Sequence, residues 1–513
     1  MKLKRFFFNA LLIVILTGFY VNLHGQDFKS MDRYFQQALS DWNVPGMSVA
    51  IVNKDSVIWT GSYGVTDINS RETVDKHTLF AVASNTKAFT AAALAMLVDD
   101  GLINWDDKVV KFLPWFKLYD PYVTQNMTIR DLLTHRSGLA TFSGDLIWYG
   151  STYSREEVIR KAAHLKPSFG FREQFGYSNI LYMAAGEIIP AVTGYSWEEY
   201  INNRLLRPLR MNRSVLSVSE LEGLENVARP HTYVKNKATA IPWLDWDNMG
   251  PAGSLISSAH DMSNWLIMNL NNGIFNNDTL ILKQRIFEMQ SANTVLPVSP
   301  SFSKRFPSTH FRAYGLGWSL MNYLGHKIVM HNGGYDGMIS QTVLIPESGF
   351  GFVILTNSLS NLYYPVMYTL LDELLLNPEK RDWSSEILTQ IRKSEETASA
   401  QKAEWEAKRI IGTKPSLKLD AYTGYYGCPI YDTVQVYSSP NGLMMQFSRS
   451  EGFKGKLTHW HYDTFEVEFT DFPSLPKGYV TFYLNRDGNP DELQIYLDNP
   501  DFDFTELELK RLE

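Results

Sequence analysis

Residues 84–98 read Ser-Asn-Thr-Lys-Ala-Phe-Thr-Ala-Ala-Ala-Leu-Ala-Met-Leu-Val, and this stretch is the most informative feature of the chain. The apolar run predicts a buried helix. Positions i and i+3 share a helix face, so the Ser84 hydroxyl and the Lys87 amine should meet near its first turn. A hydroxyl becomes a good nucleophile when a nearby base takes its proton, and a lysine can be that base when burial lowers its pKa. The stretch therefore predicts an acyl-transfer site.

The Ser-x-x-Lys pattern occurs four times, at Ser84, Ser301, Ser399 and Ser474. Prolines surround Ser301 and lie inside the motif at Ser474, which argues against a regular helix at either position. Ser399 lies in a polar, charged segment that offers no apolar surroundings for its lysine. Only Ser84 is followed by an apolar helix. The alternative for an isolated match is that Ser84 caps the helix and Lys87 is solvated.

A second motif, Tyr177-Ser178-Asn179, precedes an apolar helix that starts near Ile180. A phenol near a cation loses its proton more easily than its reference pKa of about 10 suggests. Tyr177 is therefore a candidate to relay a proton between the Ser84 hydroxyl and a leaving group. Tyr-x-Asn also occurs elsewhere in the chain, so the motif is weak when taken alone.

A third motif, His331-Asn332-Gly333-Gly334, ends an expected strand. Glycines at a strand end let a substrate backbone approach closely, and the Gly334 N–H can point into a site there. We therefore select His331, Gly333 and Gly334 as candidate substrate-binding residues. The competing interpretation of His331 is a hydrogen-bonded histidine at a strand end.

The order of expected elements predicts an α+β fold, in which an antiparallel sheet flanked by helices carries an inserted helical subdomain. Strands are expected near both ends of this region, and mostly helices between them. The expected elements are a helix at 27–42, strands at 47–52 and 57–63, helices and loops over 102–256, strands at 327–331, 339–345 and 350–356, and a helix at 364–376.

The C-terminal part differs from the first region in composition and in the spacing of its apolar residues. Residues 381–415 are rich in charged residues, serine and alanine and predict a helical or partly ordered linker. From residue 416 to 513, short alternating runs separated by Asn-Gly and Asp-Gly turns predict an all-β barrel or sandwich domain. The expected division of the chain is a leader at 1–25, a first domain at 26–380, the linker, and this β domain.

The three motifs, in this order, resemble those of the serine β-lactamase and penicillin-binding-protein superfamily, in its class C β-lactamase-related branch of esterases and D-aminopeptidases. The resemblance covers about Met31 to Leu376, and the tail resembles a lipocalin-like β domain. The matching flanks are residues 129–139 (Ile-Arg-Asp-Leu-Leu-Thr-His-Arg-Ser-Gly-Leu), 175–179 (Phe-Gly-Tyr-Ser-Asn) and 251–255 (Pro-Ala-Gly-Ser-Leu).

The resemblance implies a role for each candidate residue. Ser84 attacks a carbonyl and forms an acyl-enzyme, while Lys87 and Tyr177 share the base and acid steps. Asn179 donates a hydrogen bond to Lys87 or to the substrate amide. The N–H groups of Ser84 and Gly334 form the oxyanion hole, and such donors are typically worth about a hundredfold or more in rate. No metal or organic cofactor is implied.

His331 departs from the pattern of penicillin-binding proteins and many β-lactamases, which carry lysine at this position. A histidine with a pKa near 6.5 would be mostly neutral at pH 7 unless a neighbour raised that pKa. Esterases and D-amino-acid peptidases of this branch commonly have histidine here. We therefore expect weak or absent activity on penicillins.

Composition and the N-terminus add context. The net charge of −7 argues against a nucleic-acid partner. A basic start followed by an apolar run predicts a signal peptide at residues 1–25, hence a periplasmic or secreted bacterial protein with no membrane span after cleavage; an uncleaved anchor stays open. The single cysteine, Cys428, excludes an internal disulfide and suits a packing residue. We assign His459 and His461 to a sheet surface, with no metal.

The leading hypothesis is an exported serine hydrolase that cleaves an ester or amide through an acyl-Ser84 intermediate, as a carboxylesterase or a D-amino-acid or cell-wall peptidase. Its expected partner is a small-molecule or peptide substrate, with cell-wall material as one candidate. One alternative is a β-lactamase or D-Ala-D-Ala carboxypeptidase. Others are a non-catalytic sensor of peptides or glycans, and a protein whose β domain is the functional part.

Overall fold

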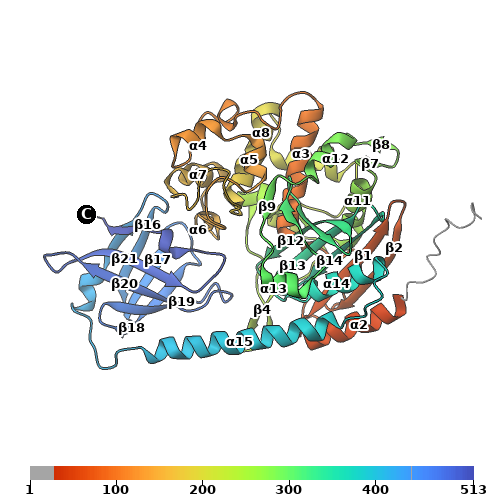
Figure 1. Cartoon of the computed structure of the whole chain (residues 1–513). Coiled ribbons are helices and arrows are strands. Elements are labelled where there is room, and N and C mark those ends of the chain that lie inside the picture. The colour runs from red at the N-terminus through yellow and green to blue at the C-terminus, as the bar shows by residue number, and fades with distance from the viewer. Residues whose placement is uncertain (1–27, 441, 513) are drawn as a thin grey trace, which may run out of the picture.

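The computed structural model describes residues 28–440 and 442–512. The expected signal peptide lies outside these residues. Figure 1 shows two bodies, one built on a large sheet with helices and one a smaller barrel, joined by the long helix α15 (Trp383–Ala407) that runs beneath both. Within the described residues, no helix has the length and apolar character needed to cross a bilayer.

An eight-stranded antiparallel sheet forms the centre of the first body, in the order β2-β1-β14-β13-β12-β11-β10-β9. The N-terminal strand β1 pairs with the late strand β14, with Met47 opposite Thr356. This pairing confirms the prediction of one sheet assembled from both ends of the region. The strands are β1 (Gly46–Asn53), β2 (Val57–Gly64), β9 (Thr294–Leu296), β10 (Arg312–Tyr314), β11 (Ser319–Tyr323), β12 (His326–Tyr335), β13 (Met338–Ile345) and β14 (Phe350–Thr356).

Both faces of the sheet are covered, as the side-chain alternation of β1 shows. Val49 and Ile51 join a core with α2 (Phe28–Asp41) and α14 (Tyr363–Leu374). Ala50 and Val52 belong to the other core, on the side of α11 (Ala259–Leu270). Because successive strand residues point to opposite faces, this apolar run needs helices on both sides.

The inserted region is mainly helical, and its centre is α3 (Thr86–Asp99). Twelve of the fourteen α3 residues, from Thr86 to Leu97, are buried, as expected for a helix that is apolar on all sides. The other helices here are α4 (Pro121–Asn126), α5 (Ile129–Leu133), α6 (Asp145–Trp148), α7 (Arg155–Lys161), α8 (Asn179–Thr193), α9 (Trp197–Ile201), α10 (Gly250–Gly253) and α12 (Lys283–Met289). Short two-stranded ribbons are β3 (Phe80–Ala81) with β6 (Ile256–Ser257), β4 (His231–Val234) with β5 (Lys237–Ala240), and β7 (Ile274–Phe275) with β8 (Asp278–Thr279).

Two local expectations were wrong. The proline-rich stretch around Ser301 does form a short helix, α13 (Pro300–Arg305), because Ser299 caps it by accepting from the Phe302 N–H and Pro300 occupies its first turn. Ser301 is nevertheless exposed. Strand β12 also continues four residues past the expected end at His331, because Asn332 to Tyr335 keep pairing with β13.

The C-terminal body is a closed eight-stranded antiparallel barrel, which confirms the predicted all-β domain. The linker before it, expected to be helical or partly ordered, contains the helix α15. The strands are β15 (Gly424–Gly427), β16 (Thr433–Ser439), β17 (Gly442–Phe447), β18 (Lys454–His461), β19 (Thr464–Phe469), β20 (Gly478–Leu484), β21 (Pro490–Leu497) and β22 (Leu509–Arg511).

The barrel packs against the loop that follows α6. The Tyr149 ring lies 4.3 Å from the Phe502 ring and 5.1 Å from the Phe472 ring, measured between centroids. Gly150 has a φ of +55°, and a Cβ there would come within 2.8 Å of Phe472. The positive φ and the close approach of Phe472 therefore favour glycine at position 150. The barrel packs directly against the helical region at this point.

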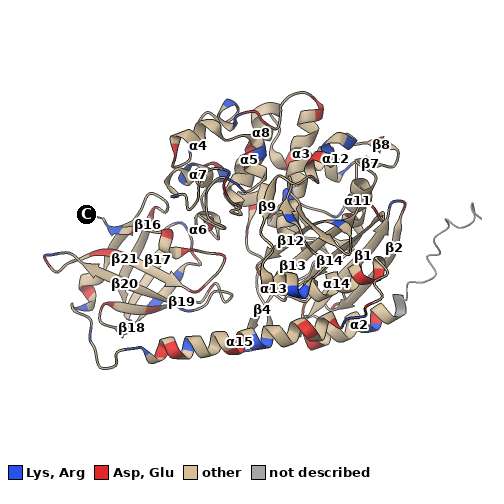
Figure 2. Ribbon diagram, viewed as in Figure 1, with Lys and Arg blue, Asp and Glu red and all other residues tan. Residues whose placement is uncertain are grey.

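Charged residues of both signs are interspersed over the two bodies and along α15 (Figure 2). Among the described residues, three ion pairs cross between the bodies: Lys161–Asp432 at 2.8 Å, Lys166–Glu508 at 2.5 Å and Arg449–Glu157 at 3.9 Å.

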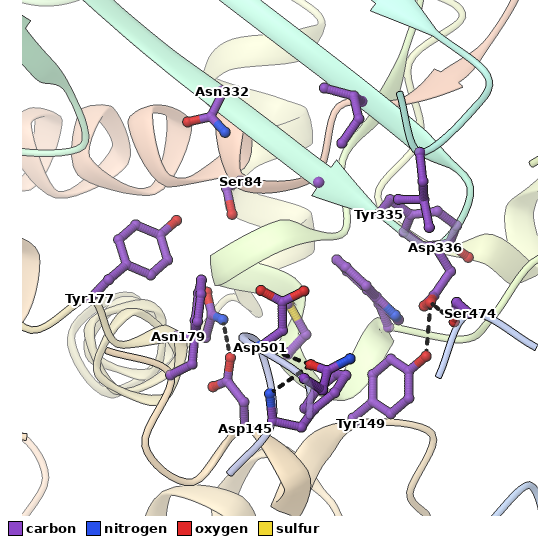
Figure 3. Close-up of a pocket in the computed structure, with 18 of the residues that line it drawn as sticks. Ser84, Asp145, Tyr149, Tyr177, Asn179, Asn332, Tyr335, Asp336, Ser474 and Asp501 are labelled. Carbon is purple, nitrogen blue, oxygen red and sulfur yellow. Dashed lines mark hydrogen bonds between the residues drawn. The ribbon is translucent and has the colours of Figure 1, made fainter. Parts of the chain in front are cut away.

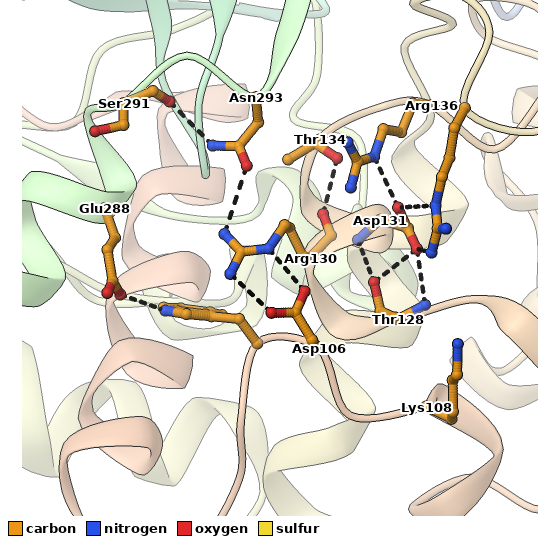
Figure 4. Close-up of polar contacts among 12 residues, drawn as sticks. Asp106, Lys108, Thr128, Arg130, Asp131, Thr134, Arg136, Glu288, Ser291 and Asn293 are labelled. Atoms are coloured by element: carbon orange, nitrogen blue, oxygen red, sulfur yellow. Dashed lines mark hydrogen bonds and ion pairs between the residues drawn. The ribbon is translucent and has the colours of Figure 1, made fainter.

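A buried carboxylate orders the segment between α5 and α8 (Figure 4). Asp131 is fully buried and accepts from Arg136 at 2.7 Å and from Arg172 at 2.6 Å. Thr128 completes a capping box with it at the start of α5. Burial alone would raise the pKa of Asp131, but hydrogen bonds from Arg172 and Thr128 hold it below the usual range. The network fixes the loop that begins at His135.

We expect Asp131→Ala to lower the free energy of unfolding by about 3–5 kcal/mol, because two arginines would lose a buried partner. Urea denaturation of the full chain measures this. The matched control is Asp106→Ala, which removes an ion pair with Arg130 at 2.9 Å from a carboxylate that is 73% exposed. It should cost about 1 kcal/mol or less. Equal losses in the two variants would contradict the assigned role of Asp131.

Candidate active site

Ser84 lies on a 3₁₀ turn (Ala83–Asn85) that leads directly into α3. Ala83 has a φ of +46°, a conformation that L residues rarely adopt, and it turns the chain sharply just before the serine. Ser84 lines a cavity of about 560 Å³. The turn thus presents the hydroxyl at the cavity surface while the helix behind it stays buried.

Lys87 is fully buried beneath Ser84 and donates three hydrogen bonds. Its Nζ lies 3.0 Å from Ser84 Oγ, 2.7 Å from Asn179 Oδ1 and 2.8 Å from the Ala252 carbonyl oxygen. An amide oxygen and a carbonyl oxygen can only accept, whereas a hydroxyl can also donate. A neutral Lys87 therefore has one partner from which its lone pair can accept a proton, and that partner is Ser84.

Burial lowers the pKa of Lys87 to about 7, and the charge of Asp145 partly opposes this shift. The cause is desolvation, which disfavours the charged ammonium. A substantial fraction of the lysine is therefore neutral near neutral pH. This is the state that can remove the proton of Ser84.

Asn179 begins α8 and links Lys87 to a second buried group. Its Oδ1 accepts from Lys87, and its Nδ2 donates to Asp145 Oδ2 at 2.6 Å. Of the two expectations for Asn179, donation to Lys87 was therefore wrong in direction, because the amide nitrogen donates to the Asp145 carboxylate. Donation to a substrate amide stays a prediction. Burial raises the pKa of Asp145 to about 7. Sequence reasoning missed Asp145, which starts α6 far from the motifs.

Tyr177 directs its hydroxyl toward Ser84 (Figure 3). Burial raises the pKa of Tyr177 well above 10, and a hydrogen bond with Ser84 only partly opposes this. The expectation that a nearby cation would ease loss of the phenol proton was wrong, since removal from water outweighs the Lys87 amine 4.8 Å from the ring centroid. Tyr177 is therefore a neutral proton donor in this site, and Lys87 is the group suited to act as base.

His135 packs against the ring of Tyr177. The sequence motifs included it only as a flanking residue, with no role assigned. Its ring centroid lies 4.2 Å from that of Tyr177, and its Nδ1 accepts from the Ser178 N–H at 3.0 Å. Burial, with Lys87 and His331 nearby, lowers the pKa of His135 well below 6.5. A neutral imidazole thus positions the Tyr177 segment.

His331 lies beside the site and not on the cavity wall. It is 2% exposed, and its Nε2 is 2.9 Å from the Tyr314 hydroxyl. Burial and the nearby Lys87 lower its pKa to about 3, so it is neutral, as the sequence suggested. Because neighbouring strand residues alternate, Asn332 takes the exposed position and lines the cavity.

The two glycines of β12 occupy different surroundings. A Cβ on Gly333 would lie 2.2 Å from the Val82 carbonyl oxygen and 2.9 Å from the Ser84 nitrogen. Gly333 therefore lets the strand pass directly against the backbone of Ser84. Gly334 lines the cavity, and a Cβ there would meet only Ile339 Cδ1 at 3.6 Å.

The barrel reaches the site through Glu506. Its Oε1 accepts from the Ser143 hydroxyl at 2.5 Å, and its Oε2 accepts from the Gly144 N–H at 2.8 Å. These residues directly precede Asp145. Barrel residues also form part of the cavity wall, namely Ser474, Leu475, Asn499, Asp501 and Phe502. The β domain therefore borders the cleft, which the sequence did not reveal.

Ser474, one of the four Ser-x-x-Lys serines, thus lines this cavity, whereas Cys428 does not. Cys428 is a free cysteine whose pKa is raised by burial beside Tyr431, in keeping with a packing residue. The described part of the chain contains no group of three or more His, Cys, Asp or Glu residues arranged to hold a metal ion.

The geometry can be compared with known proteins. A family model described as Beta-lactamase matches residues 31–376. This chain belongs to the beta-lactamase family. A second model, described as a domain of unknown function (DUF3471), matches residues 408–511 of this beta-lactamase-family chain and so covers the barrel. The resemblance predicted from the three motifs is therefore confirmed.

Relatives of this beta-lactamase-family protein include one named "Unguisins hydrolase ungD′" from Aspergillus campestris. It is 31% identical over 425 residues, which cover 79% of this chain and 76% of that protein. An octameric penicillin-binding protein homologue from Pyrococcus abyssi superposes with a TM-score of 0.60 at 23% identity, covering 94% and 100% of the two chains. A D-stereospecific amidohydrolase from Streptomyces sp. gives 0.54 at 24% identity, covering 66% and 98%. The chain is thus a hydrolase of the β-lactamase fold.

We expect Gly333→Ala to lower kcat/KM about tenfold or more and to lower Tm, because the added methyl would push β12 away from the Ser84 backbone. Gly334→Ala is the matched control, since its methyl makes only an ordinary 3.6 Å contact with Ile339, and it should leave Tm nearly unchanged. Ester hydrolysis and thermal unfolding measure the pair. Similar Tm values for both variants would contradict the close approach assigned to Gly333.

Proposed function

We propose that this protein is an exported serine hydrolase that cleaves an ester or amide bond through an acyl-Ser84 intermediate. The observation that carries the proposal is the 3.0 Å contact between Ser84 Oγ and the buried Lys87 Nζ. Among the described residues, the other hydrogen-bond partners of Lys87 are an amide oxygen and a carbonyl oxygen, which have no proton to give. Ser84 is accordingly the oxygen that becomes nucleophilic.

The reaction follows from the positions of three groups. Neutral Lys87 takes the proton of Ser84 as its oxygen attacks the carbonyl carbon of the substrate. The N–H groups of Ser84 and Gly334 stabilise the resulting oxyanion. Tyr177, a neutral phenol directed toward Ser84, passes a proton to the leaving group and recovers one from Lys87. Water then attacks the acyl-enzyme by the same route in reverse and releases the acid.

The hydrolase name of the relative at 31% identity supports a hydrolytic reaction. Carboxylesters and amides of D-amino acids, including cell-wall peptides, are the proposed substrates. Activity as a β-lactamase or a D-Ala-D-Ala carboxypeptidase is the alternative. Neutral His331 offers no fixed positive charge for a substrate carboxylate, which weighs against efficient use of penicillins.

A non-catalytic sensor of peptides or glycans would be a different class of function. The intact set of Ser84, Lys87 and Tyr177 weighs against it, because a sensor does not need a buried lysine that is hydrogen-bonded to a serine hydroxyl. The basic and apolar start of residues 1–25 supports export to the periplasm or the medium.

We expect a fluorophosphonate to add one covalent adduct to the full chain, visible by mass spectrometry of the intact protein. Attack by Ser84 on phosphorus displaces fluoride, and Lys87 takes the serine proton. Ser84→Ala should show no adduct, whereas Ser399→Ala, on the exposed face of α15, should react as wild type does. Absence of the adduct on wild type, with no ester hydrolysis, would support the sensor instead.

We also expect kcat/KM for a neutral ester to rise with pH through about 7 and then level off, because the neutral form of Lys87 is the base. Removal of the Asp145 charge by Asp145→Asn should move this rising limb to lower pH, since that charge raises the pKa of Lys87. The pH–rate profiles of both proteins measure the shift. A limb that stays in place or moves to higher pH would contradict the link between the two groups.

A further inference from the structure

The turn that presents Ser84 is strained at the residue before it. Ala83 has a φ of +46° and is fully buried. A residue with a Cβ keeps this left-handed conformation only where its surroundings hold the peptide units on either side. Glycine would adopt it without strain, yet the chain has alanine here. The contacts around Ala83 must therefore hold the turn.

A buried serine holds the first of these peptide units, which joins Val82 to Ala83. The Ser340 hydroxyl, on β13, donates to the Val82 carbonyl oxygen at 2.7 Å and accepts from Asn85 Nδ2 at 2.8 Å. The backbone N–H of Asn85 donates to the same carbonyl oxygen at 3.1 Å. Ser340 is 0% exposed and Asn85 is 2% exposed. Hydrogen bonds at buried groups such as these are costly to leave unmade, so they fix the Val82 carbonyl.

A buried threonine holds the second peptide unit, which joins Ala83 to Ser84. The Thr86 hydroxyl donates to the Ala83 carbonyl oxygen at 2.6 Å and accepts from the Leu255 N–H at 3.1 Å. In a trans peptide unit the C=O and the N–H point in opposite directions. The hydroxyl that holds the Ala83 carbonyl therefore sets the direction of the Ser84 N–H.

Gly333 leaves room for the contact of Ser340 with the turn. It pairs with Ser340 across β12 and β13, and a Cβ on Gly333 would lie 2.6 Å from the Ser340 hydroxyl oxygen and 2.2 Å from the Val82 oxygen. The next residue of β12 is Gly334, whose N–H is the second donor assigned to the oxyanion. Ser340 thus ties the turn that carries one donor to the strand that carries the other.

We propose that Ser340 and Thr86 are positioning residues for the oxyanion hole. Their hydroxyls hold Ala83 in the left-handed conformation and so aim the Ser84 N–H at the substrate carbonyl. Neither side chain lines the cavity, so both act through the backbone of the turn. The proposal rests on the proposed function, because it concerns the same reaction.

The first test measures how strongly the hole favours oxygen. p-Nitrophenyl acetate and its O-thionoacetate analogue differ only in the carbonyl atom, and sulfur is the weaker hydrogen-bond acceptor. In the full chain, Ser340→Ala should lower kcat/KM for the ester about tenfold, and the ratio of ester to thionoester about fivefold, because a misaligned donor loses most on oxygen. Thr86→Val, which keeps the side-chain shape, should lower the same ratio. A loss of folded protein alone would slow both substrates equally and keep the ratio.

Ser48→Ala is the matched control for this ratio. Ser48 is also 0% exposed, lies on β1 of the same sheet, and has its hydroxyl 3.3 Å from the Asp75 carbonyl oxygen, away from the cavity. It should keep the wild-type ratio even where its Tm falls. An unchanged ratio in Ser340→Ala, or an equal fall in Ser48→Ala, would overturn the role of Ser340. An unchanged ratio in Thr86→Val would overturn the role of Thr86.

The second test measures the hold on Ala83 without any substrate. Glycine accepts a positive φ, so Ala83→Gly relieves strain only where the turn is kept in the left-handed conformation. Ser340→Ala should release the turn, and the effects of the two substitutions on the free energy of unfolding should then not add. Urea denaturation of the full-length wild type, both single variants and the double variant measures this cycle. Additive effects would overturn the hold assigned to Ser340.

The proposed function fails separately from this inference. If fluorophosphonate labelling and ester hydrolysis are both absent while the unfolding cycle shows coupling, Ser340 holds the turn but the acyl-Ser84 reaction fails, and the oxyanion role fails with it. If labelling and hydrolysis occur while Ser340→Ala and Thr86→Val keep the ester preference, the reaction stands and the positioning role does not.

Discussion

The removal of one lysine from water is the constraint on which the rest of this site depends. Lys87 can lie in the core only because α3 is surrounded by apolar neighbours and because three oxygens accept its protons. Desolvation then lowers its pKa, and the same packing prevents water from replacing Ser84 as its partner. The helix is therefore apolar on all sides for a chemical reason as well as a structural one. A solvated lysine at this position would keep its proton at neutral pH.

Much of this arrangement could be predicted because it is local. Ser84 and Lys87 are three residues apart on one helix, so their contact follows from helix geometry alone. Asn179 was identified because it starts an apolar helix, and Gly334 because it follows a strand-end motif. The sheet could be predicted because alternating apolar runs occur at both ends of the region. In each case the signal lies within a few residues of the feature that it predicts.

The remainder depends on contacts between distant segments, which the sequence does not reveal. Asp145 is 58 positions from Lys87 in the sequence, and the two are linked by the hydrogen bonds of Asn179 and by direct charge interaction. The direction of the Tyr177 pKa shift could not be derived from the sequence. The motifs indicate a nearby cation, but they do not show that residues such as His135 and Tyr182 bury the phenol. His331 was placed at the substrate for the same reason. Strand alternation turns it inward, and this is evident only once β12 is known to continue through Tyr335.

The barrel illustrates how a second domain can change a site without touching its reactive groups. Helix α15 has 25 residues and spans about 37 Å, and it contacts both bodies. Trp383 at its start donates to Asp372, and the Trp405 ring near its end lies 4.2 Å from the Tyr479 ring of the barrel. Tyr149, Gly150 and Glu506 also hold the barrel over the cleft, because they bind it to the loops on either side of α6. Because Asp145 is the first residue of α6, the contacts that seat the barrel also hold the carboxylate nearest Lys87. The cavity wall is therefore shared, with Ser84, Tyr177 and Asn179 from the hydrolase body and Asn499, Asp501 and Phe502 from the barrel. The Ser84–Lys87 contact itself lies wholly within the hydrolase body, so the barrel borders the reactive groups without holding them.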